Sequence, residues 1–142
     1  MTKAFNWQQV FKVLGVLLIT EALFMMLAAW VSYIYDGNDL EPIIESAIIT
    51  TLAGVSGVLI GGNSTKHFGT REGYLLVGLV WIVFSIFGML PFRLSYYIPN
   101  IADAFFETMS GFTTTGATVL TSIDHLSNGI LIWRCLMQWI GG

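Results

Sequence analysis

The sequence predicts an all-helical integral membrane protein, and three observations lead to that prediction. Hydrophobic residues make up 55% of the 142 residues and charged residues only 11%, and the mean hydropathy is +0.73. A soluble domain is rarely this apolar. Three apolar runs are each long enough to cross a bilayer, which takes about 20 residues. A shorter amphipathic stretch and a Thr- and Gly-rich stretch follow them.

The first apolar run covers residues 13–35 and is interrupted only by Glu21. It is long enough to span the membrane with some tilt. A cleaved signal peptide is the alternative, because lysines precede the run, but the run is longer than a signal sequence and contains an acid. A charge in hydrocarbon costs at least about 2.5–3.5 kcal/mol, so protonation, a partner or a wet crevice is implied for Glu21. We therefore expect Glu21 to face other helices, as an interhelical hydrogen-bonding group rather than as an ion ligand.

An acidic connection follows, with Asp36, Asp39, Glu41 and Glu45. The neighbouring Gly37 and Pro42 are typical of a turn and of a helix start. We expect a solvated loop here, and an attractor for cations at a pore mouth is the alternative.

The second apolar run, residues 46–65, contains no charge. Gly57 and Gly61 form a G-x-x-x-G pair, and Ala53 and Gly54 lie near the same face, so a neighbouring helix can approach closely. Packing within the chain is the expected use of this face. Dimerisation through it, in a membrane scaffold without transport activity, is the alternative.

The third apolar run, residues 73–92, is also uncharged. Lysine and arginine favour the cytoplasmic side, and Lys3, Lys12, Lys66 and Arg71 mark the N-terminus and the second connection as cytoplasmic. The third run then leads outward, so the chain after residue 92 starts from the external face.

Residues 100–112 predict a short amphipathic helix. Apolar residues recur at spacings of four, four and three from Ile101 to Phe112, while Glu107 belongs to a polar face. Asn100 occupies the N-cap position. Such a helix rises about 16–18 Å, roughly half of a hydrocarbon core of about 30 Å. We expect a re-entrant pore helix that enters the membrane from outside without crossing it.

The next six residues predict an ion filter made of extended backbone. Three β-branched threonines favour extended backbone, and glycine supplies a dihedral combination that other residues resist. Carbonyls aligned in this way can replace the water shell of an ion, threonine hydroxyls can add ligands, and the negative end of the preceding helix favours a cation. A surface turn is the alternative. The candidate filter residues are Thr113, Thr114, Thr115, Gly116, Ala117 and Thr118.

A last helix is expected over residues 129–142, and it is too short to complete a crossing. We therefore expect a fragment or a truncated reading frame. Arg134 on this helix would be costly without a partner, and Glu107 is the candidate partner in a pair that braces the pore helix. Outward snorkelling of Arg134 is the alternative.

Other chemistry finds little support in the sequence. There is no basic patch for nucleic acid, Cys135 has no second cysteine to pair with, and His67 and His125 show no metal-binding spacing. An intramembrane enzyme using Glu21, Asp124 or His125 lacks a nucleophile motif. We expect no enzyme activity and no cofactor.

Three stretches together resemble the first part of the Trk-type potassium uptake proteins, the TrkH/TrkG family of the Trk/Ktr/HKT superfamily. They read REGYLLVGLVWIVFSIFGMLPF, DAFFETMSGFTTTGATVL and IWRCLMQWIGG. The resemblance implies residues 1–70 as an N-terminal helix pair and 71–142 as the first of four helix–pore helix–helix repeats around one potassium pathway. In this repeat the outer helix is 73–92, the pore helix 100–112, the filter 113–118 and the start of the inner helix 129–142.

The resemblance also implies a transported ion, a cellular location and binding partners. Gly116 is the filter glycine of this repeat, and potassium is the transported ion, preferred over sodium and carried by symport. The protein is a multi-pass protein of the bacterial inner membrane with a cytoplasmic N-terminus. Its partners are membrane lipid, the remaining pore repeats, a cytoplasmic TrkA-type nucleotide-binding regulatory subunit and, when complete, a second copy.

Overall fold

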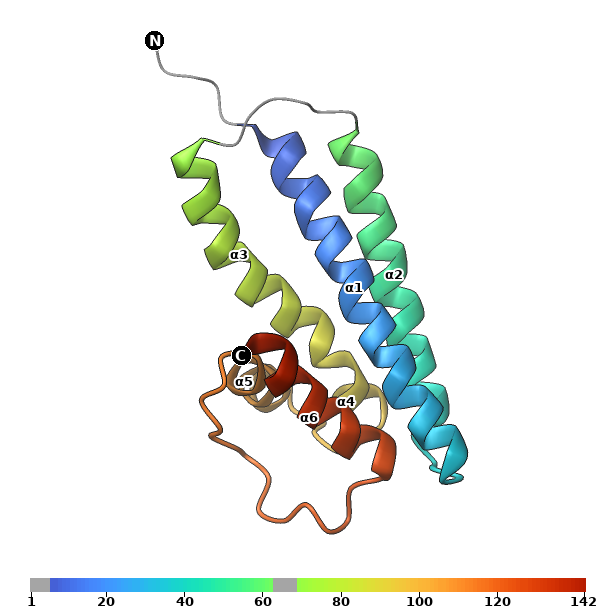
Figure 1. Ribbon diagram of the computed structural model, residues 1–142. Coiled ribbons are helices and arrows are strands. Elements are labelled where there is room, and N and C mark those ends of the chain that lie inside the picture. The colour runs from blue at the N-terminus through green and yellow to red at the C-terminus, as the bar shows by residue number, and fades with distance from the viewer. Residues whose placement is uncertain (1–5, 63–68) are drawn as a thin grey trace.

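The computed structural model describes residues 6–62 and 69–142, and every regular element in these residues is a helix (Figure 1). The all-helical fold class is therefore confirmed. The helices are α1 (Trp7–Ile34), α2 (Leu40–Gly61), α3 (Thr70–Gly88), α4 (Leu90–Leu94), α5 (Ile101–Phe112) and α6 (Asn128–Gly141).

All three apolar runs form helices that are long and apolar enough to cross a membrane, Trp7–Ile34, Leu40–Gly61 and Glu72–Leu94. The first two begin six residues earlier than predicted. The side chain of Asn6 caps α1 by accepting a hydrogen bond from the Gln9 N–H, and Pro42 lies in the first turn of α2, where its missing N–H costs nothing. Residues 63–65 of the second predicted span lie outside the described residues.

The third run is divided by a break. Pro91 has no backbone N–H, so the carbonyl of Phe87 loses its helical donor, and α3 ends at Gly88 before α4 begins at Leu90. The indole N–H of Trp133 in α6 donates to the Gly88 carbonyl at 3.0 Å. This hydrogen bond connects the end of α3 to α6.

Glycines bring α1 and α2 into close contact. A Cβ on Gly15 would stand 2.5 Å from the Gly54 carbonyl oxygen, and one on Gly61 would stand 2.6 Å from the carbonyl oxygen of Gln8. A Cβ on Gly57 would stand 3.0 Å from the Phe11 carbonyl oxygen. The G-x-x-x-G face therefore packs within the chain, as predicted, and it is not free for the alternative use in dimerisation.

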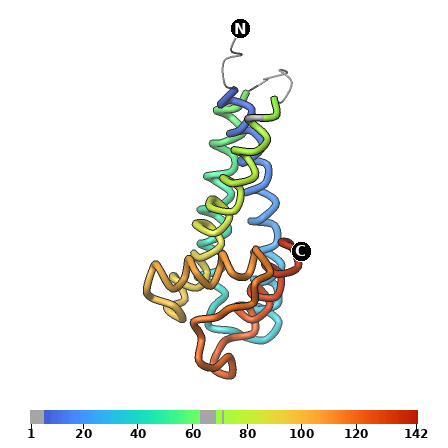
Figure 2. Tube along the Cα trace, turned by 90° about the vertical axis from the view of Figure 1, so that its left-hand side faces the viewer, coloured from blue at the N-terminus to red at the C-terminus, as the bar shows by residue number. Residues whose placement is uncertain are grey.

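The long helices stand side by side, whereas α5 lies across them (Figures 1 and 2). It is seen nearly end-on in Figure 1 and lengthwise in Figure 2. The start of α1 and the start of α3 lie at one end of the molecule. The α1–α2 connection and the loop between α5 and α6 lie toward the other end. This arrangement places the loop on the same side as the acidic connection.

The acidic connection contains one residue that holds the start of α6. Asp39 is only 1% exposed, and its carboxylate accepts hydrogen bonds from the Ile130 N–H at 2.7 Å and from the hydroxyls of Ser32 and Ser127. A carboxylate at a helix N-terminus satisfies a free N–H and matches the positive end of the helix dipole. The prediction of a solvated loop is therefore wrong for Asp39. Asp36, Glu41 and Glu45 are exposed, as predicted, but Glu41 and Glu45 lie in α2 rather than in a loop.

Replacing Asp39 by alanine is expected to destabilise the protein by about 1–3 kcal/mol, because the Ile130 N–H and two hydroxyls lose their acceptor. Thermal and denaturant unfolding in detergent would measure the loss. Glu45→Ala, at an exposed position of α2, is the matched control and should change stability by less than about 0.5 kcal/mol. Equal effects of the two substitutions would contradict the anchoring role.

Candidate functional site

The helix α5 begins as its sequence predicts. The Asn100 side chain accepts a hydrogen bond from the Ala102 N–H at 2.9 Å, and α5 ends at Phe112. Its predicted polar face, however, does not stay in solvent, because Glu107 and Ser110 are buried. Ile101, on the predicted apolar face, is exposed. Glu107 and Ser110 are buried because the loop after α5 folds back onto the polar face of the helix.

The backbone leaves the helix in steps after Phe112. Thr113 has φ −79° and ψ 3°, and Thr114 has φ +54°. Their N–H groups, and that of Thr115, bind carbonyls of the last turn of α5 at 2.9–3.0 Å. The prediction of extended backbone is therefore wrong for Thr113 and Thr114, because these amides still find acceptors in the helix. The turn ends at Thr114, and the irregular backbone of residues 115–118 includes Gly116 at φ +76°, the dihedral predicted to need glycine.

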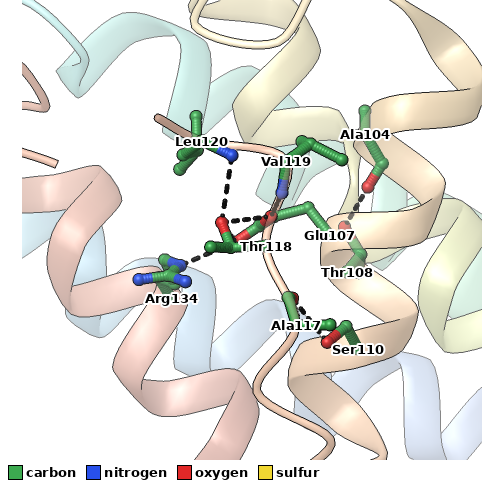
Figure 3. A network of polar contacts seen from close by, with 9 residues as sticks. All are labelled: Ala104, Glu107, Thr108, Ser110, Ala117, Thr118, Val119, Leu120 and Arg134. Carbon is green, nitrogen blue, oxygen red and sulfur yellow. Dashed lines mark hydrogen bonds and ion pairs between the residues drawn. The ribbon is translucent and has the colours of Figure 1, made fainter. Parts of the chain in front are cut away.

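The carboxylate of Glu107 is the centre of the polar contacts around this segment (Figure 3). Glu107 is 2% exposed. Its carboxylate accepts from Arg134 Nε at 2.7 Å, from the Thr118 hydroxyl at 2.8 Å and from the Val119 N–H at 3.0 Å. The Arg134 side chain is 21% exposed. Hydrogen bonds to an ionised group are about twice as strong as neutral ones, so this carboxylate joins α5, α6 and the loop.

A second contact ties the loop to α5 one turn further on. The Ser110 hydroxyl donates to the Ala117 carbonyl at 2.6 Å, and both residues are drawn in Figure 3. Together, Glu107 and Ser110 hold the far end of the candidate filter against the helix. Sequence reasoning missed both contacts, because a residue spacing of 7 to 11 across a loop has no periodic signature.

The oxygen atoms of residues 113–118 divide into two groups. The Thr118 hydroxyl donates to Glu107 and accepts from the Leu120 N–H at 3.1 Å, and its role as an added ion ligand stays a prediction. The Thr113 hydroxyl donates to the Met109 carbonyl. By contrast, five carbonyls of the segment accept no hydrogen bond from the residues that the structure describes, those of Thr113, Thr114, Thr115, Gly116 and Thr118.

The end of α6 closes against the end of α5. A Cβ on Gly141 would stand 1.7 Å from the Phe112 carbonyl oxygen, and one on Gly142 would stand 2.8 Å from the Thr114 side chain. Only glycine permits this approach. The helix predicted over residues 129–142 begins at Asn128. The close approach of Gly141 and Gly142 to the end of α5 was not predicted.

Glu21 departs from its expectation. It is 1% exposed and faces other helices, as predicted, but neither carboxylate oxygen has a hydrogen-bond partner among the described residues. The prediction of an interhelical hydrogen bond is therefore wrong. Asp124 and His125 lie exposed on the α5–α6 loop, away from the cavity that Glu21 lines. These three residues do not converge on one site.

In residues 6–62 and 69–142, no group of three or more His, Cys, Asp or Glu side chains could hold a metal ion. His125 lies near the ring of Tyr97, with 6.4 Å between ring centroids. His67, Lys3 and Lys66 lie outside the described residues.

Comparison with known proteins gives consistent matches. The family model TrkH, described as "Cation transport protein", matches residues 40–142. The Trk system potassium uptake protein TrkH of Halomonas elongata is 35% identical over 136 residues, which cover 95% of this chain and 28% of that protein. The protein of the same name in Escherichia coli K12 is 34% identical over 139 residues, or 96% of this chain and 29% of that protein.

A solved structure matches as well. The crystal structure of the potassium transporter TrkH from Vibrio parahaemolyticus superposes with a TM-score of 0.89 at 31% sequence identity. The match covers 96% of this chain and 30% of that one. The chain therefore spans less than a third of the length of these relatives.

Replacing Arg134 by alanine is expected to destabilise the protein by about 3–5 kcal/mol, because the buried Glu107 charge loses its counter-charge. Unfolding in detergent would measure the loss. Asp103→Asn is the matched control, since Asp103 is an exposed acid on the same helix and only its helix-dipole contribution, about 0.3–1 kcal/mol, is at stake.

Exchanging the two charges, with Glu107→Arg and Arg134→Glu together, is expected to recover part of that loss. Recovery stays incomplete because arginine at position 107 cannot accept from Thr118 and Val119. Unchanged stability of Arg134→Ala would show that the pair does not brace α5.

Proposed function

Because this chain belongs to the TrkH family of cation transport proteins, we propose that it forms the first part of the potassium-translocating membrane subunit of a Trk-type uptake system. The observation that carries the proposal is the segment 113–118. It follows the C-terminal end of α5, contains Gly116 at positive φ, and has carbonyls without a hydrogen-bond donor among the described residues.

The proposed mechanism is dehydration of the ion followed by coordination by backbone carbonyls. Five of the six carbonyls of this segment are candidate ligands, because they accept no hydrogen bond among the described residues, whereas the Ala117 carbonyl accepts from Ser110. The C-terminus of a helix carries a partial charge of roughly −0.5, so the end of α5 attracts a cation to this segment. Glu107 and Arg134 are the structural pair that holds the segment in place.

We assign α5 as the re-entrant pore helix, α3 and α4 as the outer helix, and α6 as the start of the inner helix. Residues 1–70 would then form the N-terminal helix pair and 71–142 the first pore repeat. Lys12 is the sixth residue of α1, and α1 and α3 begin at the same end of the molecule (Figure 1). Basic residues favour the cytoplasm. This supports a cytoplasmic N-terminus and entry of the ion from outside, in a multi-pass protein of the bacterial inner membrane.

One repeat cannot surround an ion, so the proposal includes the remaining pore repeats of a longer protein. A cytoplasmic TrkA-type nucleotide-binding subunit, a second copy of the complete protein and membrane lipid are the proposed partners, and transport is proposed to occur by symport. No catalytic residue is assigned. The scaffold alternative lost its main support when the G-x-x-x-G face proved to be packed against α1.

Complementation tests the proposal as a whole. The complete reading frame should restore growth of potassium-uptake-deficient bacteria at low potassium, whereas residues 1–142 alone should not, because they supply one repeat. A complete protein that reaches the membrane, folds and fails to restore growth would favour the scaffold alternative.

Replacing Gly116 by serine in the complete protein is expected to reduce the discrimination between potassium and sodium by roughly tenfold, because a side chain at positive φ costs about 1–2 kcal/mol and distorts the carbonyls. Competitive rubidium and sodium uptake would measure it. Gly62→Ser is the matched control, since Gly62 also has positive φ but caps the C-terminal end of α2. Unchanged ion preference in Gly116→Ser would remove this residue from the pathway.

A further inference from the structure

Glu21 lines a cavity of about 250 Å³ between four helices. Apart from the carboxyl group, the wall is largely apolar, with contributions from Leu17, Phe24, Val80, Phe84, Phe112 and Ile140. Gly88 makes room for the acid, because a Cβ at that position would stand 2.9 Å from Glu21 Oε1. The absence of a side chain at Gly88 therefore leaves the space that the Glu21 carboxyl group occupies.

No described group neutralises a charge on this acid. Neither oxygen of Glu21 has a hydrogen-bond partner among the described residues. Glu107 provides a contrast within the same molecule, because it is equally buried but bound by Arg134, Thr118 and Val119. An ionised carboxylate left unpaired in an apolar cavity costs several kcal/mol, whereas the neutral acid costs much less.

Among the described side chains of α1, α3, α5 and α6, Glu21 is the one charged or titratable group that lines the cavity. Arg134 of α6 is bound to Glu107 of α5. Lys12 lies nine residues from Glu21 on α1, about 13 Å along the axis, and Glu72 lies eight residues before Val80 on α3, about 12 Å away. Tyr33, Tyr74, Asp103 and Cys135 on these helices are exposed.

A helix end beside the cavity also disfavours a negative charge. Phe112 lines the cavity and is the last residue of α5, and the C-terminal end of a helix carries a negative partial charge. An anion at Glu21 would be repelled by that end. Burial, the missing partner and the helix dipole thus act in the same direction.

We propose that Glu21 is a proton-binding site, a carboxylic acid that keeps its proton in the cavity beside the end of α5. The ligand is a proton, and the site is built by Gly88, Phe112 and the apolar wall. Loss of the proton would place an unpaired negative charge beside Gly88 and Phe112, which pack around the carboxyl group. The packing of α5 in this cavity therefore requires the neutral form of Glu21. The inference needs the cavity and the membrane, and it does not depend on the proposed ion pathway.

Infrared spectroscopy of the complete protein in lipid bilayers tests the proposal, because protonated and ionised carboxyl groups absorb in separate bands. At pH 7 we expect Glu21→Gln to remove one protonated-acid band. Glu107→Gln and Glu45→Gln are the controls, one a buried and paired carboxylate and one an exposed carboxylate, and both should leave that band in place. Glutamine matches the shape and neutrality of the protonated acid, so Glu21→Gln is expected to fold with unchanged thermal stability.

Several results would overturn the assignment. One is a protein whose protonated-acid band is absent, or is unaffected by Glu21→Gln. Another is a band that converts to the ionised form when potassium is added, which would make Glu21 a cation site. A Glu21→Gln protein that no longer folds would also count against a neutral acid, because it would indicate an ionised residue with a partner in the complete protein.

Discussion

The carboxylate of Glu107 determines how the irregular part of this molecule is held. It joins the short helix α5, the loop that carries residues 113–118, and the last helix α6. The loop forms no helix or strand, so it has no backbone ladder of its own to fix its path. In a low-dielectric setting, one buried anion with a guanidinium and two hydrogen-bond donors supplies that constraint. The position of the candidate filter therefore depends on this carboxylate more than on local backbone preference.

Close backbone approach is the second constraint on the fold. In lipid there is little hydrophobic drive for helices to associate, so small residues that allow close packing take on that role. Glycines at 15, 54, 57 and 61 do this between α1 and α2. Gly141 does it between α6 and the end of α5. The helix pair and the candidate pore repeat are thus assembled by the same physical means.

Three buried acids show how differently one residue type is used. Asp39 meets the N-terminus of α6, where N–H groups and the helix dipole favour an anion. Glu107 meets a guanidinium. Glu21 meets neither among the described residues. All three interrupt or adjoin apolar stretches, so their sequence context alone does not distinguish an anchor, an ion pair and a neutral acid.

The sequence by itself determined the elements whose physics is local. Apolar runs of membrane length became α1, α2 and α3, Asn100 capped α5, and Gly116 took the backbone dihedral that glycine allows. Motifs also identified the family. The tertiary structure alone decided that Asp39 is buried, that Glu21 lacks a partner, and that the Thr118 hydroxyl is bound to Glu107. Those outcomes depend on groups up to 91 residues away along the chain. Local periodicity and propensity describe a residue's near neighbours, whereas the environment of a buried polar group is set by whichever distant element packs against it.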